Sequence, residues 1–239
     1  MNEAKEQGRQ QAYAAASTGA DVGQGPSTKK PSRKRWITAG VVAVVVIAAA
    51  IGFWTWHEQP SFCGAICHTP MDNYLATYEQ ENGVAGVDKW GNAVENTAGM
   101  MAVVHREAGD TCMSCHVPTL SEQIGEGVAW VSGGYQYPLN ETDLAALTAA
   151  SGKDNDSFCL NEACHTNDDG TVMTRQQLEA RTSNFERNPH EVHHQELECS
   201  TCHKGHRASV NYCSNCHRDA PIPDGWISAA EEAKLSRSV

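Results

Sequence analysis

Residues 188–217 of this 239-residue chain read NPHEVHHQELECSTCHKGHRASVNYCSNCH. This stretch contains two Cys-x-x-Cys-His units, at residues 199–203 and 213–217. Such a unit is the attachment signature of c-type haem: its two thiols form thioethers to the porphyrin, and its histidine is placed to bind the iron. Further histidines surround the two units and could supply the second axial ligand of each iron. The stretch therefore predicts haem groups packed closely together.

The same pattern accounts for every cysteine in the chain. The ten cysteines fall into five pairs, and a histidine directly follows the second cysteine of each pair. A disulfide scaffold or a set of zinc sites would not require that histidine each time. We therefore expect five covalently bound haem c groups. The candidate thioether residues are Cys63, Cys67, Cys112, Cys115, Cys159, Cys164, Cys199, Cys202, Cys213 and Cys216, and the candidate proximal iron ligands are His68, His116, His165, His203 and His217.

Composition agrees with a cofactor-rich protein. Hydrophobic residues make up 40% of the chain, but one apolar run near the N-terminus contains a large share of them. The remainder is poor in large aliphatic residues and would not build an ordinary core of this size, whereas haem would add large apolar bodies. The formal net charge is −11. A nucleic-acid partner is excluded on this ground, because phosphate binding requires a basic surface.

The apolar run predicts a membrane anchor. Residues 36–56 contain no charged side chain and, as a helix, would span roughly 30 Å, the thickness of a bilayer core. Residues 1–35 are expected to be a disordered tail that ends in a basic cluster, which places the N-terminus in the cytoplasm. A cleaved signal peptide is the alternative, because small residues at 48–50 resemble a cleavage site. In either case residues 57–239 are expected to form an extracytoplasmic haem domain.

The supply of further axial ligands nearly equals the demand. Five irons with proximal histidines need up to five distal ligands, and two histidines on one iron leave no open position for a substrate. The count therefore favours an electron relay over a small-molecule reductase. Met71 could instead pack against a haem edge, and His57 is interpreted as a residue of the membrane interface. The distal candidates are Met71, His105, His190, His193 and His206, with His194 as the alternative to His193.

The first haem site lies close to the predicted anchor, within reach of a lipid-soluble quinol. Asp88 and Lys89 are candidates for the proton chemistry of quinol oxidation near that haem. The ordinary alternative is that both side chains belong to a solvated surface.

Two family resemblances refine these expectations. Residues 188–217 resemble the tetrahaem cytochrome modules found alone and in flavocytochrome fumarate reductases, through an Asn-Pro-His-x-x-His opening followed by Cys-x-x-Cys-His-x-x-His and a further Cys-x-x-Cys-His. This resemblance implies that three of the spare histidines are distal ligands, and that the histidines of the two units are proximal ones. The three implied distal ligands are His190, His193 and His206.

The N-terminal half resembles the NapC/NrfH family of membrane-anchored quinol dehydrogenases. It has one N-terminal anchor, Met71 and Tyr74 shortly after His68, and Cys-x-x-Cys-His-Val-Pro at the second site. In that family the methionine binds the first haem and menaquinol is oxidised there. This chain differs in a longer first spacer, in a methionine one residue further from His68, and in having five sites where many members have four.

These observations predict one transmembrane helix followed by a multihaem cytochrome c domain, with short helices and coil around a haem chain and little or no sheet. Short helices are expected at 119–131, 141–150, 173–183 and 228–235, the last with Ser228 as N-cap and Glu231 in a capping box. The expected role is to pass electrons from the menaquinol pool to an extracytoplasmic reductase, either flavin-dependent or multihaem. A homo-oligomer is a further candidate assembly. The alternatives are a terminal reductase with an open haem, such as a nitrite reductase, and a conductive assembly of stacked haems.

Overall fold

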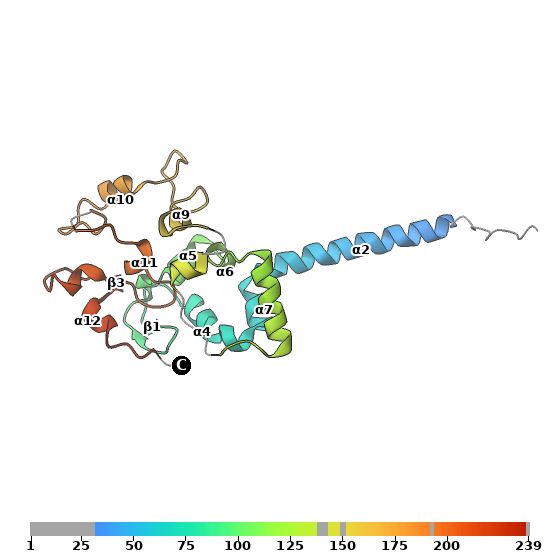
Figure 1. The fold of residues 1–239 in the computed structure, drawn as a ribbon, viewed down its shortest axis with the longest axis horizontal. Coiled ribbons are helices and arrows are strands. Elements are labelled where there is room, and N and C mark those ends of the chain that lie inside the picture. The colour runs from blue at the N-terminus through green and yellow to red at the C-terminus, as the bar shows by residue number, and fades with distance from the viewer. Residues whose placement is uncertain (1–31, 138–142, 149–151, 192–193, 238–239) are drawn as a thin grey trace, which may run out of the picture. The chain divides into compact units, whose positions relative to one another are not determined.

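The computed structural model describes residues 32–137, 143–148, 152–191 and 194–237. Most of the predicted N-terminal tail, and His193, lie outside these residues. Two compact units are present, one up to Ala50 and one from Ile51 onward. Short helices joined by loops make up most of the described chain, and its strands form only two small two-stranded sheets (Figure 1). The predicted fold class is confirmed.

The helices and strands of the described residues are short, with the exception of one helix near the N-terminus. The helices are α2 (Arg33–His57), α3 (Pro60–Ile66), α4 (His68–Tyr78), α5 (Met101–Ala108), α6 (Cys112–Cys115), α7 (Leu120–Ser132), α8 (Leu144–Thr148), α9 (Asn155–Cys159), α10 (Arg175–Arg181), α11 (Cys199–Cys202) and α12 (Ala229–Glu232). Two 3₁₀ turns, η1 (Thr97–Gly99) and η3 (Tyr212–Asn215), accompany them. The antiparallel pair is β1 (Gly86–Val87) with β2 (Ala93–Val94), and the parallel pair is β3 (Val210–Asn211) with β4 (Ile227–Ser228).

The exception is α2, which has 25 residues and is about 38 Å long at the usual rise of a helix. None of its residues is buried. Among the described residues it is the one helix long and apolar enough to cross a membrane, judged by length and composition. It extends the predicted span of 36–56 by a few residues at its start and one at its end. The helix is compatible with a single-pass membrane anchor.

The first cysteine pair follows directly after α2. Pro60 starts α3, where its fixed φ suits the first turn of a helix, and Gln59 before it is extended. The Phe62 ring packs edge-on against Trp56 at 5.0 Å between centroids and against His57 at 4.8 Å. These contacts fix α3, and with it Cys63, to the end of the apolar helix.

A small core joins the segments that carry two candidate ligands. Its buried residues are Val94, Met100, Val103 and Ala208, and Ile227 packs against them. The free N–H groups at the start of α5 donate to carbonyls of the chain near residue 205: Met101 N–H to Lys204 O and Ala102 N–H to Gly205 O, both at 3.0 Å. Because α5 carries His105 and the loop carries His206, these bonds tie the two histidine-bearing segments together.

Capping motifs set the starts of several other helices. Thr119 with Glu122 begins α7, and Ser228 with Glu231 begins α12. The helix predicted at 173–183 is present as α10, and the described part of 141–150 forms α8. The last helix is shorter than predicted and ends at Glu232, because the chain beyond it makes tighter turns, with Leu235 N–H donating to Glu232 O.

Candidate functional site

Each cysteine pair closes a tight loop in the chain. In the second, fourth and fifth sites the histidine N–H donates to the carbonyl of the first cysteine, at 2.8, 3.0 and 2.8 Å. One helical turn then places both thiols and the histidine around a common point. The first site closes through Cys67 N–H to Cys63 O at 3.0 Å, and the third through His165 N–H to Cys159 O at 3.4 Å. The longer spacers therefore still form closed loops.

The cysteines of consecutive sites lie next to one another. All ten are free thiols, so they form no disulfide scaffold. Two pairs of thiols from neighbouring sites lie in close contact, and two more are close enough to interact electrostatically. The pairs in close contact are Cys63 with Cys112 and Cys159 with Cys199, and the electrostatic pairs are Cys115 with Cys164 and Cys202 with Cys213.

Four imidazole pairs form the centre of the site. Each joins a motif histidine to one of the candidate distal histidines, with centroid separations between 6.1 and 6.4 Å. Two pairs have nearly parallel rings, with interplanar angles of 7° and 18°. The pairs are His105 with His165, His116 with His206, His190 with His203, and His194 with His217.

This separation fits a metal ion between two imidazoles. A metal–imidazole bond is about 2 Å long, and the bonding nitrogen lies about 1 Å from its ring centroid. Two imidazoles on opposite sides of one iron therefore have centroids about 6 Å apart. The separations of the four pairs match this value. Together with closed cysteine loops and a small core, these residues fit covalently attached haem.

Two of the histidines in this arrangement, His206 and His203, are held neutral by burial. Burial, with a smaller effect of His116, lowers the pKa of His206 to about 3. Burial likewise lowers the pKa of His203 to about 4, helped by His190 nearby. A neutral imidazole has the lone pair that binds a metal.

The first site differs from the other four. His68 and Met71 lie three residues apart in α4, which begins at His68. The structure describes the backbone of His68 but not its side chain, so no imidazole partner is assigned there. Positions three apart on a helix are neighbours on one face. Met71 therefore lies beside position 68.

Asp88 and Lys89 have different surroundings in the structure. Asp88 is buried, and its carboxylate accepts bonds from Trp90 N–H and Asn92 N–H at 2.8 and 2.9 Å, which hold a turn. The Lys89 ammonium lies 5.6 Å from the centroid of the Tyr74 ring, on the helix that begins at His68. Lys89 is therefore the member of the pair that faces the haem-bearing segments.

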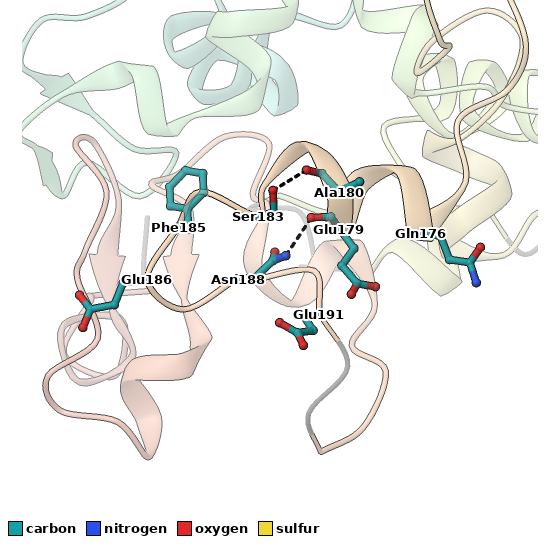
Figure 2. A pocket seen from close by; sticks show the side chains of 8 residues that line it. All are labelled: Gln176, Glu179, Ala180, Ser183, Phe185, Glu186, Asn188 and Glu191. Atoms are coloured by element: carbon teal, nitrogen blue, oxygen red, sulfur yellow. Dashed lines mark hydrogen bonds between the residues drawn. The ribbon is translucent and has the colours of Figure 1, made fainter.

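A pocket of about 680 Å³ lies beside the His190 loop (Figure 2). Its lining contains three carboxylates, those of Glu179, Glu186 and Glu191. Among the residues that the structure describes, no group of three or more His, Cys, Asp and Glu side chains is arranged to hold a metal ion. Asn188 at its rim accepts His190 N–H at 3.1 Å, so this wall positions the histidine.

Sequence reasoning missed the polar residues that support the ligands. Thr77 and Thr182 each contact the Nδ1 atom of a candidate distal histidine, at 2.7 and 3.1 Å. Asp156 pairs with Arg175 through Arg175 Nε at 2.6 Å and also contacts the Cys199 thiol at 3.7 Å. No local pattern marks these residues, because their partners are set by the fold.

Comparisons with known proteins agree with covalently bound haem c. Residues 145–218, which contain three of the five motifs, match the family described as cytochrome c3. The chain is 60% identical over 207 residues to the cytochrome c-type protein Cgr1 of Eggerthella lenta, across 86% of this chain and 93% of that protein. No solved structure matches the chain.

Proposed function

This chain belongs to the multihaem c-type cytochromes, and from that membership we propose that it is a membrane-anchored pentahaem relay from menaquinol to an extracytoplasmic reductase. The set of four imidazole pairs at the spacing of an iron with two histidine ligands carries the proposal. Bound haem supplies reversible one-electron chemistry at its iron. With both axial positions filled, four of the five sites would pass electrons and offer no position to a substrate.

The contacts between cysteines support a continuous path. Thioethers formed at Cys63 and Cys112 would hold the edges of the first two haems against each other. Cys159 and Cys199 would do the same for the third and fourth. Cys115 and Cys164 would link the second and third sites in the same way, and Cys202 and Cys213 the fourth and fifth, so the order of haems in space would follow the order of motifs in the sequence.

Entry of electrons is assigned to the first site. Cys63 lies six residues after His57, the last residue of the apolar helix. A quinol dissolved in the membrane would reach this site more readily than any other. Lys89, beside Tyr74, is the candidate to assist the proton release that accompanies quinol oxidation. The basic residues before the helix favour a cytoplasmic N-terminus, which puts all five sites on the outer side.

Exit of electrons is assigned to the fifth site at the other end of the motif series. A flavin-dependent or multihaem reductase would dock there. The net charge of −11 favours a partner with a basic surface around its electron entry site.

The decisive experiment uses the full chain with its haems, purified in detergent and kept anaerobic. Menaquinol should reduce the haems, seen as growth of the sharp α-band of ferrous low-spin haem in stopped-flow absorbance. Dithionite serves as the reference, because it reduces every haem regardless of a quinol site. Haems that respond to dithionite but not to menaquinol would refute the proposed entry of electrons.

A further inference from the structure

Thr77 lies in the last turn of α4 and is almost completely buried, with 1% of its surface exposed. Its hydroxyl makes two contacts. It donates to Tyr74 O at 2.8 Å, and it lies 2.7 Å from Nδ1 of His206. Both contacts are short enough to be full hydrogen bonds.

The first contact fixes the direction of the second. A threonine hydroxyl carries one proton, and here a carbonyl oxygen, which can only accept, takes it. The bond to His206 therefore requires Nδ1 to carry a proton and to donate it to the hydroxyl oxygen. A neutral imidazole protonated at Nδ1 has its lone pair on Nε2, which is the atom left to bind iron.

The same arrangement recurs at a second, separate place. The Thr182 hydroxyl lies 2.9 Å from Leu178 O and 2.6 Å from Asn188 Oδ1, and 3.1 Å from Nδ1 of His190. Its single proton goes to one of the two oxygens, so Nδ1 of His190 is again the donor. His190 faces His203 with nearly parallel rings 6.4 Å apart, and His206 faces His116 at the same separation.

We propose that Thr77 and Thr182 are positioning residues for His206 and His190. Each threonine holds its histidine in the tautomer able to bind iron and raises the basicity of the nitrogen that binds it. The inference rests on the ligand pairing proposed above. A hydrogen bond from the distal nitrogen of a ligating imidazole to an acceptor orients the ring and raises its basicity. A more basic ligand stabilises ferric over ferrous iron, so each threonine lowers the reduction potential of its haem.

An ordinary role for these threonines makes a different prediction. Threonines in helices often donate to a carbonyl three or four residues earlier, without any effect on a neighbour. Thr97 provides the matched control, because it is fully buried and donates to Glu81 O at 2.6 Å. No histidine takes part in that hydrogen bond.

The test compares Thr77→Val, Thr77→Ser and Thr97→Val in the complete haem-loaded protein. Potentials are measured by redox titration, and the low-spin ferric signals by electron paramagnetic resonance. Thr77→Val should raise the potential of one haem and shift its signal, Thr77→Ser should restore both, and Thr97→Val should leave all five haems unchanged. Unchanged potentials in Thr77→Val, or an equal shift in Thr97→Val, would overturn the inference.

Two further variants keep the result interpretable. If Thr77→Val does not fold, Thr182→Val at the less buried site should shift the haem bound by His190 instead. His206→Ala tests the ligation itself, because it should remove one low-spin signal. A normal spectrum in His206→Ala would refute the pairing, whereas a lost signal in His206→Ala together with no effect of Thr77→Val would refute the positioning role alone.

Discussion

Replacement of His194 by alanine decides which of two adjacent histidines completes the fifth site. The ring centroids of His194 and His217 lie 6.2 Å apart, with an interplanar angle of 18°. Removing about 1 Å on each side for the distance from centroid to nitrogen leaves about 4 Å, the length of two iron–nitrogen bonds. His194→Ala should therefore convert one haem in five from six-coordinate low-spin to five-coordinate high-spin.

Because one haem changes its spin state, electron paramagnetic resonance can measure the effect quantitatively. About one quarter of the ferric low-spin intensity that comes from the four histidine-paired sites should disappear in electron paramagnetic resonance, and a high-spin signal of matching intensity should replace it. The haem content should stay at five per chain, because the thioether cysteines are untouched. His193→Ala is the neighbouring control and should retain the full low-spin intensity. A loss in His193→Ala with none in His194→Ala would refute the pairing of His194 with His217.

Three other outcomes test the fold and the cofactor content. Met100→Ala should lower the free energy of unfolding by about 2–5 kcal/mol, because Met100 is fully buried. Val104→Ala, at a surface position, should lower it far less. Both are measured by denaturation followed by circular dichroism. Asp156→Asn should destabilise the protein by about 1–2 kcal/mol at pH 7, a figure reduced for the partial exposure of its ion pair with Arg175. Arg175 lowers the pKa of Asp156 in the folded state, so the carboxylate contributes stability above the unfolded pKa of about 3.9. The loss of stability in Asp156→Asn should therefore shrink as pH falls below about 4 and vanish once the wild-type carboxyl is protonated. A loss of stability that stays constant down to about pH 2 would contradict this. Replacing both cysteines of the third site by serine should reduce the mass of the protein by one haem, and an unchanged mass would show that this spacer does not attach haem.

Much of the fold could be predicted from local patterns in the sequence. A cysteine pair with an adjacent histidine closes its own loop, and a capping box such as Ser228 with Glu231 starts its own helix, so both are readable from a few residues. The run of apolar residues that forms α2 is equally local. The histidines outside the cysteine motifs could also be identified as candidate ligands from the sequence, because this requires only their residue type.

The pairing of ligands could not be read in this way. His116 and His206 are separated by 90 residues, so their meeting depends on the packing of α5 against the loop near residue 205. Near residue 190 the described chain forms a turn. The turn is explained by Pro189 and by Asn188, whose side chain accepts His190 N–H.

The long separation between paired histidines has a consequence for how the protein is made. The second site, at Cys112 and Cys115, is synthesised long before His206, the histidine that faces His116. In the fourth and fifth sites the facing histidines, His190 and His194, precede the motif histidines in the chain, so they are already present when those motifs are made. If haem attached to the second site as soon as that site was made, its iron would lack this ligand until the C-terminal third arrived. A chain truncated before His206 would therefore leave the second haem incompletely ligated.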